Sequence, residues 1–221
     1  MPRIARAVAP GLPHHVTQRG NYRQPVFENE DDFLRYYFWL KKYSRQNDLS
    51  IWAYCFMPNH VHYVCVPQGQ KSLSRTFNIL HMRYSQYFHR KKNIKGHLWQ
   101  GRFYSSILDE RHLFAAIRYV ENNPVRAGIV RNPKNYRWSS VHGHLFKHSD
   151  TVLAEDCHLE REIQDWSVYL KGKEDTRLFE NIRKNSLTGR PCGDDIFIQA
   201  IEKLLERKLK AREWGRPRRK S

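Results

Sequence analysis

The chain has 221 residues, with 39 Lys and Arg against 22 Asp and Glu, which gives a formal net charge of +17 at pH 7. Hydrophobic residues make up 40% and aromatic residues 13%, enough for a sizeable core, so a globally disordered chain is excluded. No apolar run approaches the roughly 18 residues of a membrane span, and the N-terminus lacks a secretory apolar core. We therefore expect a soluble, cytoplasmic protein of one domain with an appendage, or of two small domains.

The elements follow from local patterns in the first 121 residues. Asn29 fits a helix N-cap, because three acidic residues follow it in the positively polarised first turn. Pro58-Asn59 is a turn signal between two runs of strand formers, which predicts a hairpin. Asp109 caps a last helix that stops before Pro124. In chain order we predict a strand at 14–19, a helix at 30–46, strands at 49–56 and 60–67, a helix from 72 or 74 to 90, a strand at 99–108 and a helix at 110–121.

The first six of these elements have the order of the ferredoxin-like, split βαβ arrangement. We therefore predict an α+β fold with an antiparallel sheet and helices packed on one face, which leaves the other face or the edge beside the last helix for a ligand. Residues 1–145 would form this domain. Residues 146–221 predict a helical, basic extension, whose last helix runs from Asp194 or Asp195 to about Arg212 and docks through Ile198, Ile201 and Leu205.

The charge is unevenly distributed along the chain. No acidic residue lies between Asp48 and Asp109, while eight Lys and Arg do, together with several aromatic residues. Such a stretch predicts a positive surface on which phosphates replace counterions, with rings on which unpaired bases stack. One alternative for the charge is a basic protein charged only for solubility. The alternative for the aromatic residues is that they belong to the core. The candidate phosphate contacts are Arg83, Arg90, Lys91, Lys92, Lys95 and Arg102.

The sharpest local motif is His60-Val61-His62. On a strand, residues i and i+2 face the same side, so both imidazoles can bind one metal ion while Val61 points into the core. Two histidines without a carboxylate leave positions on the metal open for phosphate oxygens. Alternatively, these are half-buried strand histidines with no ligand.

A second motif lies on the last predicted helix. Tyr119 and Asn123 are four residues apart, so they share one helix face. A tyrosine there could attack phosphorus and form a covalent intermediate, and Asn123 could supply a neutral oxygen as a third metal ligand. The alternative is a packing tyrosine and an asparagine that ends the helix ahead of Pro124.

Taken together, these motifs resemble the HUH single-tyrosine transposases, and most closely their REP-associated tyrosine transposase branch. The resemblance covers about residues 10–145. It rests on the joint occurrence, in order, of Pro58-Asn59-His60-Val61-His62, Trp99-Gln100-Gly101-Arg102-Phe103 and the segment from Tyr119 to Asn122-Asn123-Pro124-Val125-Arg126-Ala127-Gly128. The absence of a second tyrosine at 122 or 123 argues against the two-tyrosine relatives.

The resemblance implies a function. His60 and His62, with Asn123 as third ligand, would bind Mg²⁺ or Mn²⁺, and Tyr119 would be the nucleophile. The implied activity is cleavage and strand transfer of single-stranded DNA at REP-like palindromic hairpins, through a 5′-phosphotyrosine. The sequence leaves open whether the protein acts as a monomer or a homodimer.

Two other functions stay open from the sequence. One is a catalytically inactive protein that binds DNA hairpins with the same fold. The other is a metal-dependent nuclease or RNA-binding protein with a ferredoxin-like fold, which would use the same basic surface and would not need Tyr119.

Overall fold

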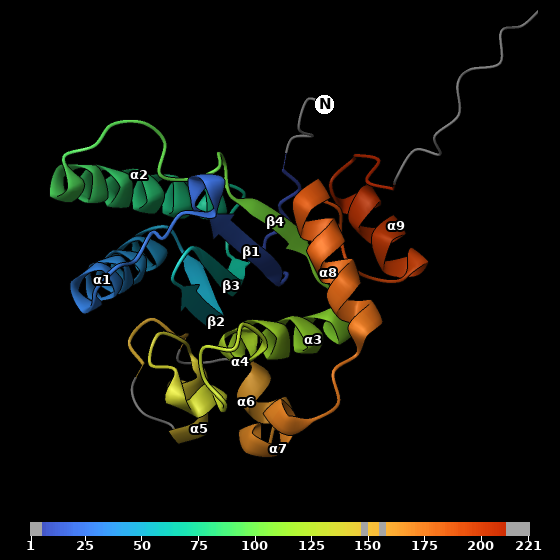
Figure 1. The fold of residues 1–221 in the computed structure, drawn as a ribbon. Helices are drawn as coiled ribbons and strands as arrows, with labels where there is room; N and C mark the ends of the chain where they lie inside the picture. Colours follow the sequence, from blue (N-terminus) through green and yellow to red (C-terminus); the bar gives the residue numbers. More distant parts are fainter. Residues whose placement is uncertain (1–5, 147–149, 155–157, 211–221) are drawn as a thin grey trace, which may run out of the picture.

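A computed structural model describes residues 6–146, 150–154 and 158–210. Its four strands form one antiparallel sheet in the order β2-β3-β1-β4, the strand order of a ferredoxin-like fold (Figure 1). The strands are β1 (His14–Arg19), β2 (Leu49–Met57), β3 (His60–Pro67) and β4 (Tyr104–Ile107). The predicted α+β class and antiparallel sheet are confirmed.

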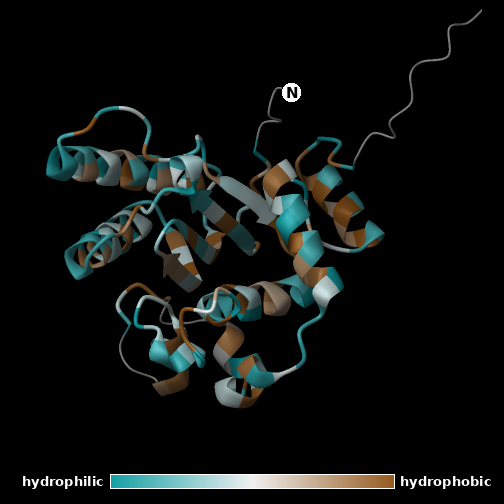
Figure 2. Ribbon diagram, in the orientation of Figure 1, coloured by the Kyte–Doolittle hydropathy of each residue, from teal (hydrophilic) through white to brown (hydrophobic). Residues whose placement is uncertain are grey.

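The helices of the first 126 residues are α1 (Glu30–Gln46), α2 (Ser72–Lys92), α3 (Glu110–Glu121) and the short α4 (Asn123–Arg126). Those that follow are α5 (Val141–Phe146), α6 (His158–Glu162), α7 (Trp166–Lys171), α8 (Thr176–Thr188) and α9 (Asp195–Leu204). Hydrophobic and hydrophilic residues alternate along these helices, as expected where one side packs on a core (Figure 2). Among the described residues, no helix is both long and apolar enough to cross a membrane.

Side chains along β3 alternate between two cores. Val61, Tyr63 and Cys65 belong to a large apolar cluster with α1 and α2, which cover one face of the sheet. Val64 belongs to a second cluster, built with α3 and α7 on the opposite face. Because neighbouring strand residues point to opposite faces, His60 and His62 lie on the α3 side with Val64.

Of the two places that we expected to be left for a ligand, the other face of the sheet is covered. α3 packs against β1, β2 and β3, and α8 packs against β1 and β4, so helices lie on both faces of the sheet (Figure 1). α1 and α2 share one face as predicted for the ferredoxin-like part. The opposite face is a second core because the chain after residue 109 returns over it.

Two predicted elements are shorter in the structure. The strand expected at 99–108 is only Tyr104–Ile107, because Gly101 has φ +143° and Trp99 turns into the core against His81. The last helix ends at Leu204 and not near Arg212. Two of the three expected docking residues make the contact, since Ile201 is buried with Ile107 and Leu205 packs against this cluster. Ile198 does not belong to the cluster, and the preceding Phe197 packs there instead. The basic residues beyond Lys210 lie outside the described residues, and the domain boundary at 145 stays a prediction.

Asp32 joins the start of α1 to the end of α2. Its backbone N–H donates to the Asn29 side chain in a capping box, and its buried carboxylate accepts from Lys91 Nζ at 2.7 Å and from the Tyr87 hydroxyl at 2.9 Å. Burial would raise the pKa of this carboxyl, but the hydrogen bonds from Lys91, the Glu28 backbone and Tyr87 outweigh burial and lower the pKa.

Replacing Asp32 with asparagine should therefore lower the free energy of unfolding by about 1.5–3 kcal/mol at pH 7, the range for hydrogen bonds to a charged group. The folded pKa lies below the unfolded value of about 3.9, so this stabilisation is present above that pH and is lost as the pH falls through the folded pKa. Urea unfolding of both proteins at pH 7 and in acid measures it. Asp31→Asn, at an exposed neighbour, is the control and should cost about 0.5 kcal/mol or less. A pH-independent difference between wild type and Asp32→Asn would contradict the prediction.

Candidate active site

The two histidines of the His-x-His motif lie side by side on the α3 face of β3. Their ring centroids are 4.9 Å apart and both side chains are buried. Burial, together with the nearby charge of Arg19, lowers the pKa of His60 to about 3, and burial holds the pKa of His62 well below its ordinary value. Both rings are therefore neutral at pH 7, which is the form that binds metal ions.

The tautomer of His60 follows from its neighbour in the motif. Asn59 donates its Nδ2–H to the carbonyl of Arg23 at 3.1 Å, so its Oδ1 is turned toward His60. His60 Nδ1 lies 2.6 Å from that oxygen and must be the donor. The ring proton is thus on Nδ1, and Nε2 keeps its lone pair, with no hydrogen-bond partner among the described residues.

His62 has a comparable partner on the neighbouring strand. In the antiparallel pairing of β1 with β3, Thr17 lies opposite His62, and His15 is two residues further along β1 on the same face. His62 Nδ1 lies 3.0 Å from His15 Nε2, and the two rings are stacked with centroids 5.2 Å apart. The Nδ1 atoms of both motif histidines are therefore engaged inside the protein.

Tyr119 of α3 packs directly against this pair of strands. Its ring meets His62 edge-on at 5.5 Å between centroids, His15 at 6.0 Å and Phe179 of α8 at 5.3 Å. Its hydroxyl has no hydrogen-bond partner among the residues that the structure describes, and the residue is only half-buried. Tyr119 follows His62 by 57 positions in the sequence. The fold nevertheless brings the tyrosine and the His-x-His motif into one site.

The end of α3 is fixed by residues that follow it in the chain. The carboxylate of Glu121 is fully buried and accepts from His144 Nδ1 at 2.7 Å and from the hydroxyl of Ser140. Asn122 donates its Nδ2–H to the Leu170 carbonyl at 3.0 Å. These contacts hold the helix turn that carries Tyr119 against α5 and α7.

Asn123, the predicted third ligand, is buried one residue past the cap of α3. Its amide nitrogen has no hydrogen-bond partner among the described residues. A buried amide with an unused polar atom is suited to an external ligand, and the oxygen and nitrogen of such an amide are interchangeable by rotation.

Two arginines that the sequence interpretation left out lie near Tyr119. The guanidinium of Arg126 lies over the Tyr119 ring, 4.1 Å from its centroid, and donates to the Tyr119 carbonyl. Arg19 of β1 is close enough to Tyr119 to interact with it electrostatically, and its charge contributes to the lowered pKa of His60. Arg126 belongs to the motif that begins at Tyr119, and this membership could have marked it as a site residue. Arg19 lies outside the three motifs, so nothing in the sequence marked it.

The donor set fits a divalent metal ion. The Nδ1 atoms of both neutral imidazoles are engaged by internal partners, so Nε2 of His60 keeps its lone pair, and Nε2 of His62 does so when its Nδ1 is the donor to His15. The buried amide of Asn123, whose nitrogen has no partner among the described residues, would add an oxygen. In the part of the chain that the structure describes, no three His, Cys, Asp or Glu side chains form a metal-binding group. A site here would therefore have two histidines and no carboxylate, which leaves positions for phosphate oxygens.

The family model "Transposase IS200 like" matches residues 9–123, slightly more than half of the chain, including the motifs that form this site. The chain belongs to the IS200-like transposase family. The predicted family and its DNA-transposing class of function are thereby confirmed. No curated protein matches the sequence.

One solved structure supports the same fold. The structure of a REP-associated tyrosine transposase bound to a REP hairpin is 20% identical, with a TM-score of 0.54 over 71% of this chain and 93% of the other. At this identity the likeness shows a shared fold. A transposase candidate from Deinococcus radiodurans R1 is also 20% identical, with a TM-score of 0.38 over 54% of this chain and 96% of that one.

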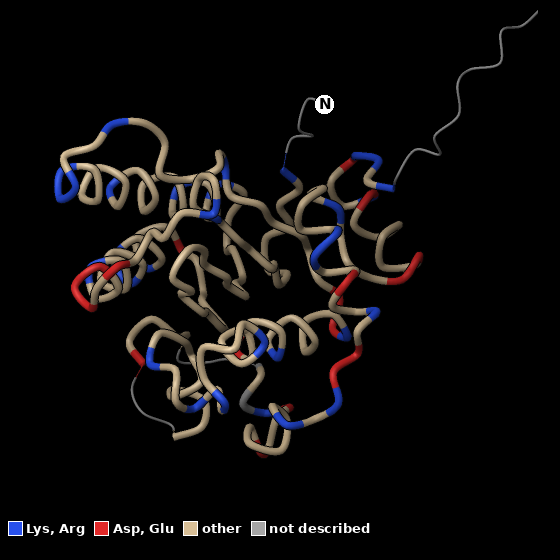
Figure 3. The backbone as a smooth tube through the Cα atoms, in the orientation of Figure 1, with Lys and Arg blue, Asp and Glu red and all other residues tan. Residues whose placement is uncertain are grey.

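The basic residues that the sequence singled out in this transposase lie mostly on the other face of the sheet. Arg83, Arg90 and Lys91 line a groove between α1 and α2, across the sheet from Tyr119. Lys91 pairs with Asp32, and Lys92 pairs with Glu28 at 3.0 Å. The acid-free stretch is therefore next to acidic residues at the start of α1, which are visible in Figure 3. The partners in these ion pairs are about 60 positions apart in the sequence, so the sequence alone did not indicate the pairing.

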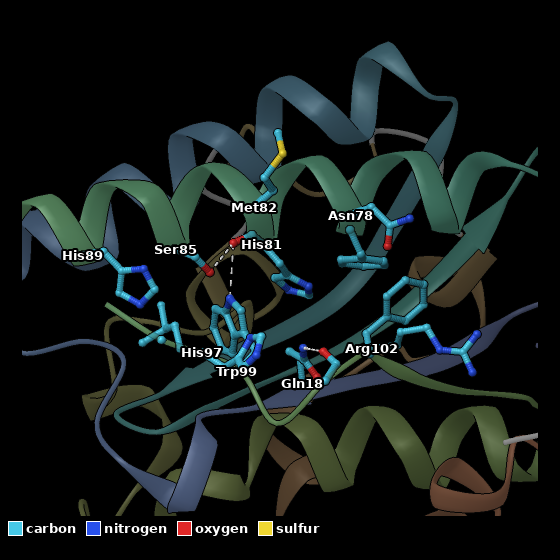
Figure 4. Close-up of a pocket in the computed structure, with 14 residues that line it drawn as sticks. Gln18, Asn78, His81, Met82, Ser85, His89, His97, Trp99 and Arg102 are labelled. Atoms are coloured by element: carbon cyan, nitrogen blue, oxygen red, sulfur yellow. Dashed lines mark hydrogen bonds between the residues drawn. The ribbon is translucent and has the colours of Figure 1, made fainter. Parts of the chain in front are cut away.

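Arg102 lies on a separate pocket, between α2 and the loop before β4 (Figure 4). Gln18 of β1 lies at its base and donates to the Gly101 carbonyl at 2.7 Å. Trp99, also from the Trp-Gln-Gly-Arg-Phe motif, closes one side and donates to the His81 carbonyl at 3.3 Å. This motif builds the loop beside α2, and its aromatic residues are core, as the alternative interpretation held.

We predict that alanine at His60 or His62 weakens Mn²⁺ binding by more than the roughly 10–100-fold that loss of an outer-shell partner costs. Each variant removes one Nε2 ligand, while the sheet keeps its apolar packing on the α1 and α2 face. Electron paramagnetic resonance titration measures free Mn²⁺, and circular dichroism checks the fold. His142→Ala, outside the site, is the control. Unchanged Mn²⁺ affinity with a lowered melting temperature would make both residues core histidines. Asn123→Ala should have a smaller effect, because water can replace a neutral ligand.

A second prediction concerns the basic groove and the loop beside it. Glutamine at the exposed Arg83, Arg90 and Lys95 should weaken DNA binding for every sequence and flatten the plot of log affinity against log salt by about 0.7–0.9 per lost contact. The double change Lys91→Gln and Lys92→Gln should alter the slope less per residue, since acidic partners already neutralise these lysines. Fluorescence anisotropy at several salt concentrations decides it. A slope unchanged by the triple variant would show that this surface does not contact DNA.

Proposed function

We propose that this transposase cleaves and rejoins single-stranded DNA at hairpin-forming palindromes, with Tyr119 as the nucleophile and a divalent ion bound by His60, His62 and Asn123. One observation carries the proposal. The ring of Tyr119, from α3, packs edge-on against His62, from β3, and the two come from motifs far apart in the chain. A nucleophile beside a metal-binding pair is the arrangement that attack on a phosphodiester requires.

The reaction balances without an energy source. Tyr119 Oη bonds to a backbone phosphorus, and the bond from phosphorus to the 3′ oxygen of the preceding nucleotide breaks. The tyrosine proton passes to solvent and the departing 3′ oxygen takes up a proton. The products are a 5′-phosphotyrosine and a free 3′-OH, and attack by that or another 3′-OH on the phosphotyrosine reverses the step. One phosphodiester is exchanged for another of similar energy.

The protein's own groups prepare this step. The hydroxyl of the half-buried Tyr119 has no hydrogen-bond partner among the described residues and is available to a substrate, and the Arg126 guanidinium over the ring places a positive charge beside it. Arg19 adds a second positive charge for the scissile phosphate. The bound Mg²⁺ or Mn²⁺ would supply Lewis-acid polarisation of the phosphate. Asn59 and His15 keep the Nδ1 atoms of the two histidines occupied, so that Nε2 faces outward.

The hairpin substrate is supported from two sides. The fold neighbour with a TM-score of 0.54 was solved with a REP hairpin bound. In this chain, basic residues extend along α2 and the loop after it (Figure 3), and the exposed Arg83, Arg90 and Lys95 among them would follow the phosphates of a stem. The unpaired flank would then cross to the Tyr119 side.

We predict that Tyr119→Phe abolishes covalent adduct formation while hairpin affinity stays within about twofold, because only the nucleophilic oxygen is lost. Labelled hairpin DNA with a single-stranded flank is incubated with protein and Mg²⁺, and the products are separated under denaturing conditions. Tyr169→Phe is the matched control. Tyr169 of α7 packs against Arg118, which lies on α3 next to Tyr119, but Tyr169 itself is outside the site. Its variant should therefore still form the adduct.

The outcomes separate the competing functions. A hairpin-bound wild type with no adduct indicates an inactive binding protein. Cleavage without an adduct, unaffected by Tyr119→Phe, indicates a metal-dependent nuclease that uses water. An adduct that persists in Tyr119→Phe moves the nucleophile to another residue.

A further inference from the structure

We propose that His15 is a positioning residue for the metal site, and that Ser186 of α8 holds it in place. His15 would accept the Nδ1–H of His62 and so direct the Nε2 lone pair of His62 toward the divalent ion. The inference rests on the proposed function, since it concerns the metal site that function uses, but it adds two residues and a helix that neither the motifs nor the family match assigns.

The hydrogen bonds form a chain through the interior. His62 Nδ1 lies 3.0 Å from His15 Nε2, and His15 Nδ1 lies 2.6 Å from Ser186 Oγ. Ser186 Oγ is in turn 3.2 Å from Ser106 Oγ of β4. All four side chains are buried, so water does not compete for these bonds. A buried chain of this kind fixes both ring orientations.

The hydrogen-bond chain has two possible arrangements of its protons, and only one of them leaves Nε2 of His62 free to bind a metal ion. If Ser186 donates to His15 and His15 donates to His62, the remaining proton of neutral His62 is on Nε2 and blocks the ligand atom. If His62 donates to His15 and His15 donates to Ser186, Nε2 of His62 is free. Because the Ser186 hydroxyl can both donate and accept, it allows the second direction by donating to Ser106.

His60 and His62 are therefore positioned by different parts of the protein. The partner of His60 is Asn59, the preceding residue, whereas the partner of His62 depends on β1 and on α8. α8 lies along the α3 side of the sheet next to β4 (Figure 1). It belongs to the segment that the sequence predicts as an extension, beyond the family match at residues 9–123. The extension thus becomes a component of the metal site.

The test compares two adjacent buried histidines of β1. His15→Leu should weaken Mn²⁺ binding about 10–100-fold, the cost of losing an outer-shell partner of a metal-bound histidine. His14→Leu is the control, because His14 is equally buried but bonds to Ala9 and Leu12 and is absent from the site. His14→Leu should leave Mn²⁺ affinity unchanged. His15→Gln, whose amide can accept near the position of Nε2, should recover most of the loss.

Two further measurements make the result specific to positioning. Ser186→Ala should weaken Mn²⁺ binding about two- to tenfold, the equilibrium factor of one neutral hydrogen bond. Nitrogen-15 spectra of the Mg²⁺-loaded protein should place the His62 proton on Nδ1 in the wild type. Folding is followed by thermal unfolding for every variant, so that affinity is compared only between folded proteins.

Several results would overturn the inference. These are wild-type Mn²⁺ affinity in His15→Leu, equal losses in His14→Leu and His15→Leu, no rescue by His15→Gln, a His62 proton on Nε2, or no Mn²⁺ binding by the wild type. Failure of the proposed function looks different. In that case Mn²⁺ affinity depends on His15 as expected, but the wild type forms no covalent adduct with hairpin DNA.

Discussion

The alternation of side chains along β3 is the constraint on which the rest of the site depends. Every residue of this strand is buried, so each must satisfy one of two cores. Val61 and Tyr63 meet the apolar side chains of α1 and α2, and the intervening His60 and His62 face α3. A shift of one residue in the pairing of β1 with β3 would place the imidazoles among apolar rings and Val61 beside Tyr119.

The cost of burying two imidazoles is offset by specific partners. The Asn59 side chain accepts from His60 Nδ1, His15 Nε2 is the hydrogen-bond partner of His62 Nδ1, and both rings stay neutral. The same contacts that reduce the cost of burial leave Nε2 of His60, and in the proposed tautomer Nε2 of His62, without a partner among the described residues. One arrangement of hydrogen bonds therefore serves both fold stability and ligand binding. On the facing helix, the buried Glu121 and Asn122 anchor the turn of Tyr119 through α5 and α7. The tyrosine therefore depends on contacts from residues 140–170 for its placement.

The sequence predicted the features that interactions between neighbouring residues control, such as helix caps, turns and strand alternation. The capping residues Asn29 and Asp109, the Pro58-Asn59 turn and the alternation along β3 gave the element order and, with it, the ferredoxin-like core. The joint motifs identified the family before any geometry was known. His60, His62 and Tyr119 do lie together, and their roles remain a proposal.

The features that could not be predicted from the sequence depend on contacts between residues far apart in the chain. Lys91 lies in a stretch without acids, yet Asp32 of another helix neutralises it. His15 has no motif of its own, and its partner Ser186 is 171 positions away, so only the fold brings them together. The prediction of one strand over 99–108 was too long because Gly101 has a positive φ, which ends the extended conformation there. A glycine can adopt either sign of φ, so its place among strand formers did not indicate this break.

The most direct measurement maps the covalent bond between protein and DNA. Trypsin cleavage after Arg118 and Arg126 releases peptide 119–126, in which Tyr119 is the only side chain with a hydroxyl. We expect mass spectrometry of the digested wild-type adduct to find a 5′-phosphorylated oligonucleotide on this peptide, and on it alone. An oligonucleotide on any other peptide, or cleaved hairpin with no modified peptide, would contradict the assignment of Tyr119 as the nucleophile.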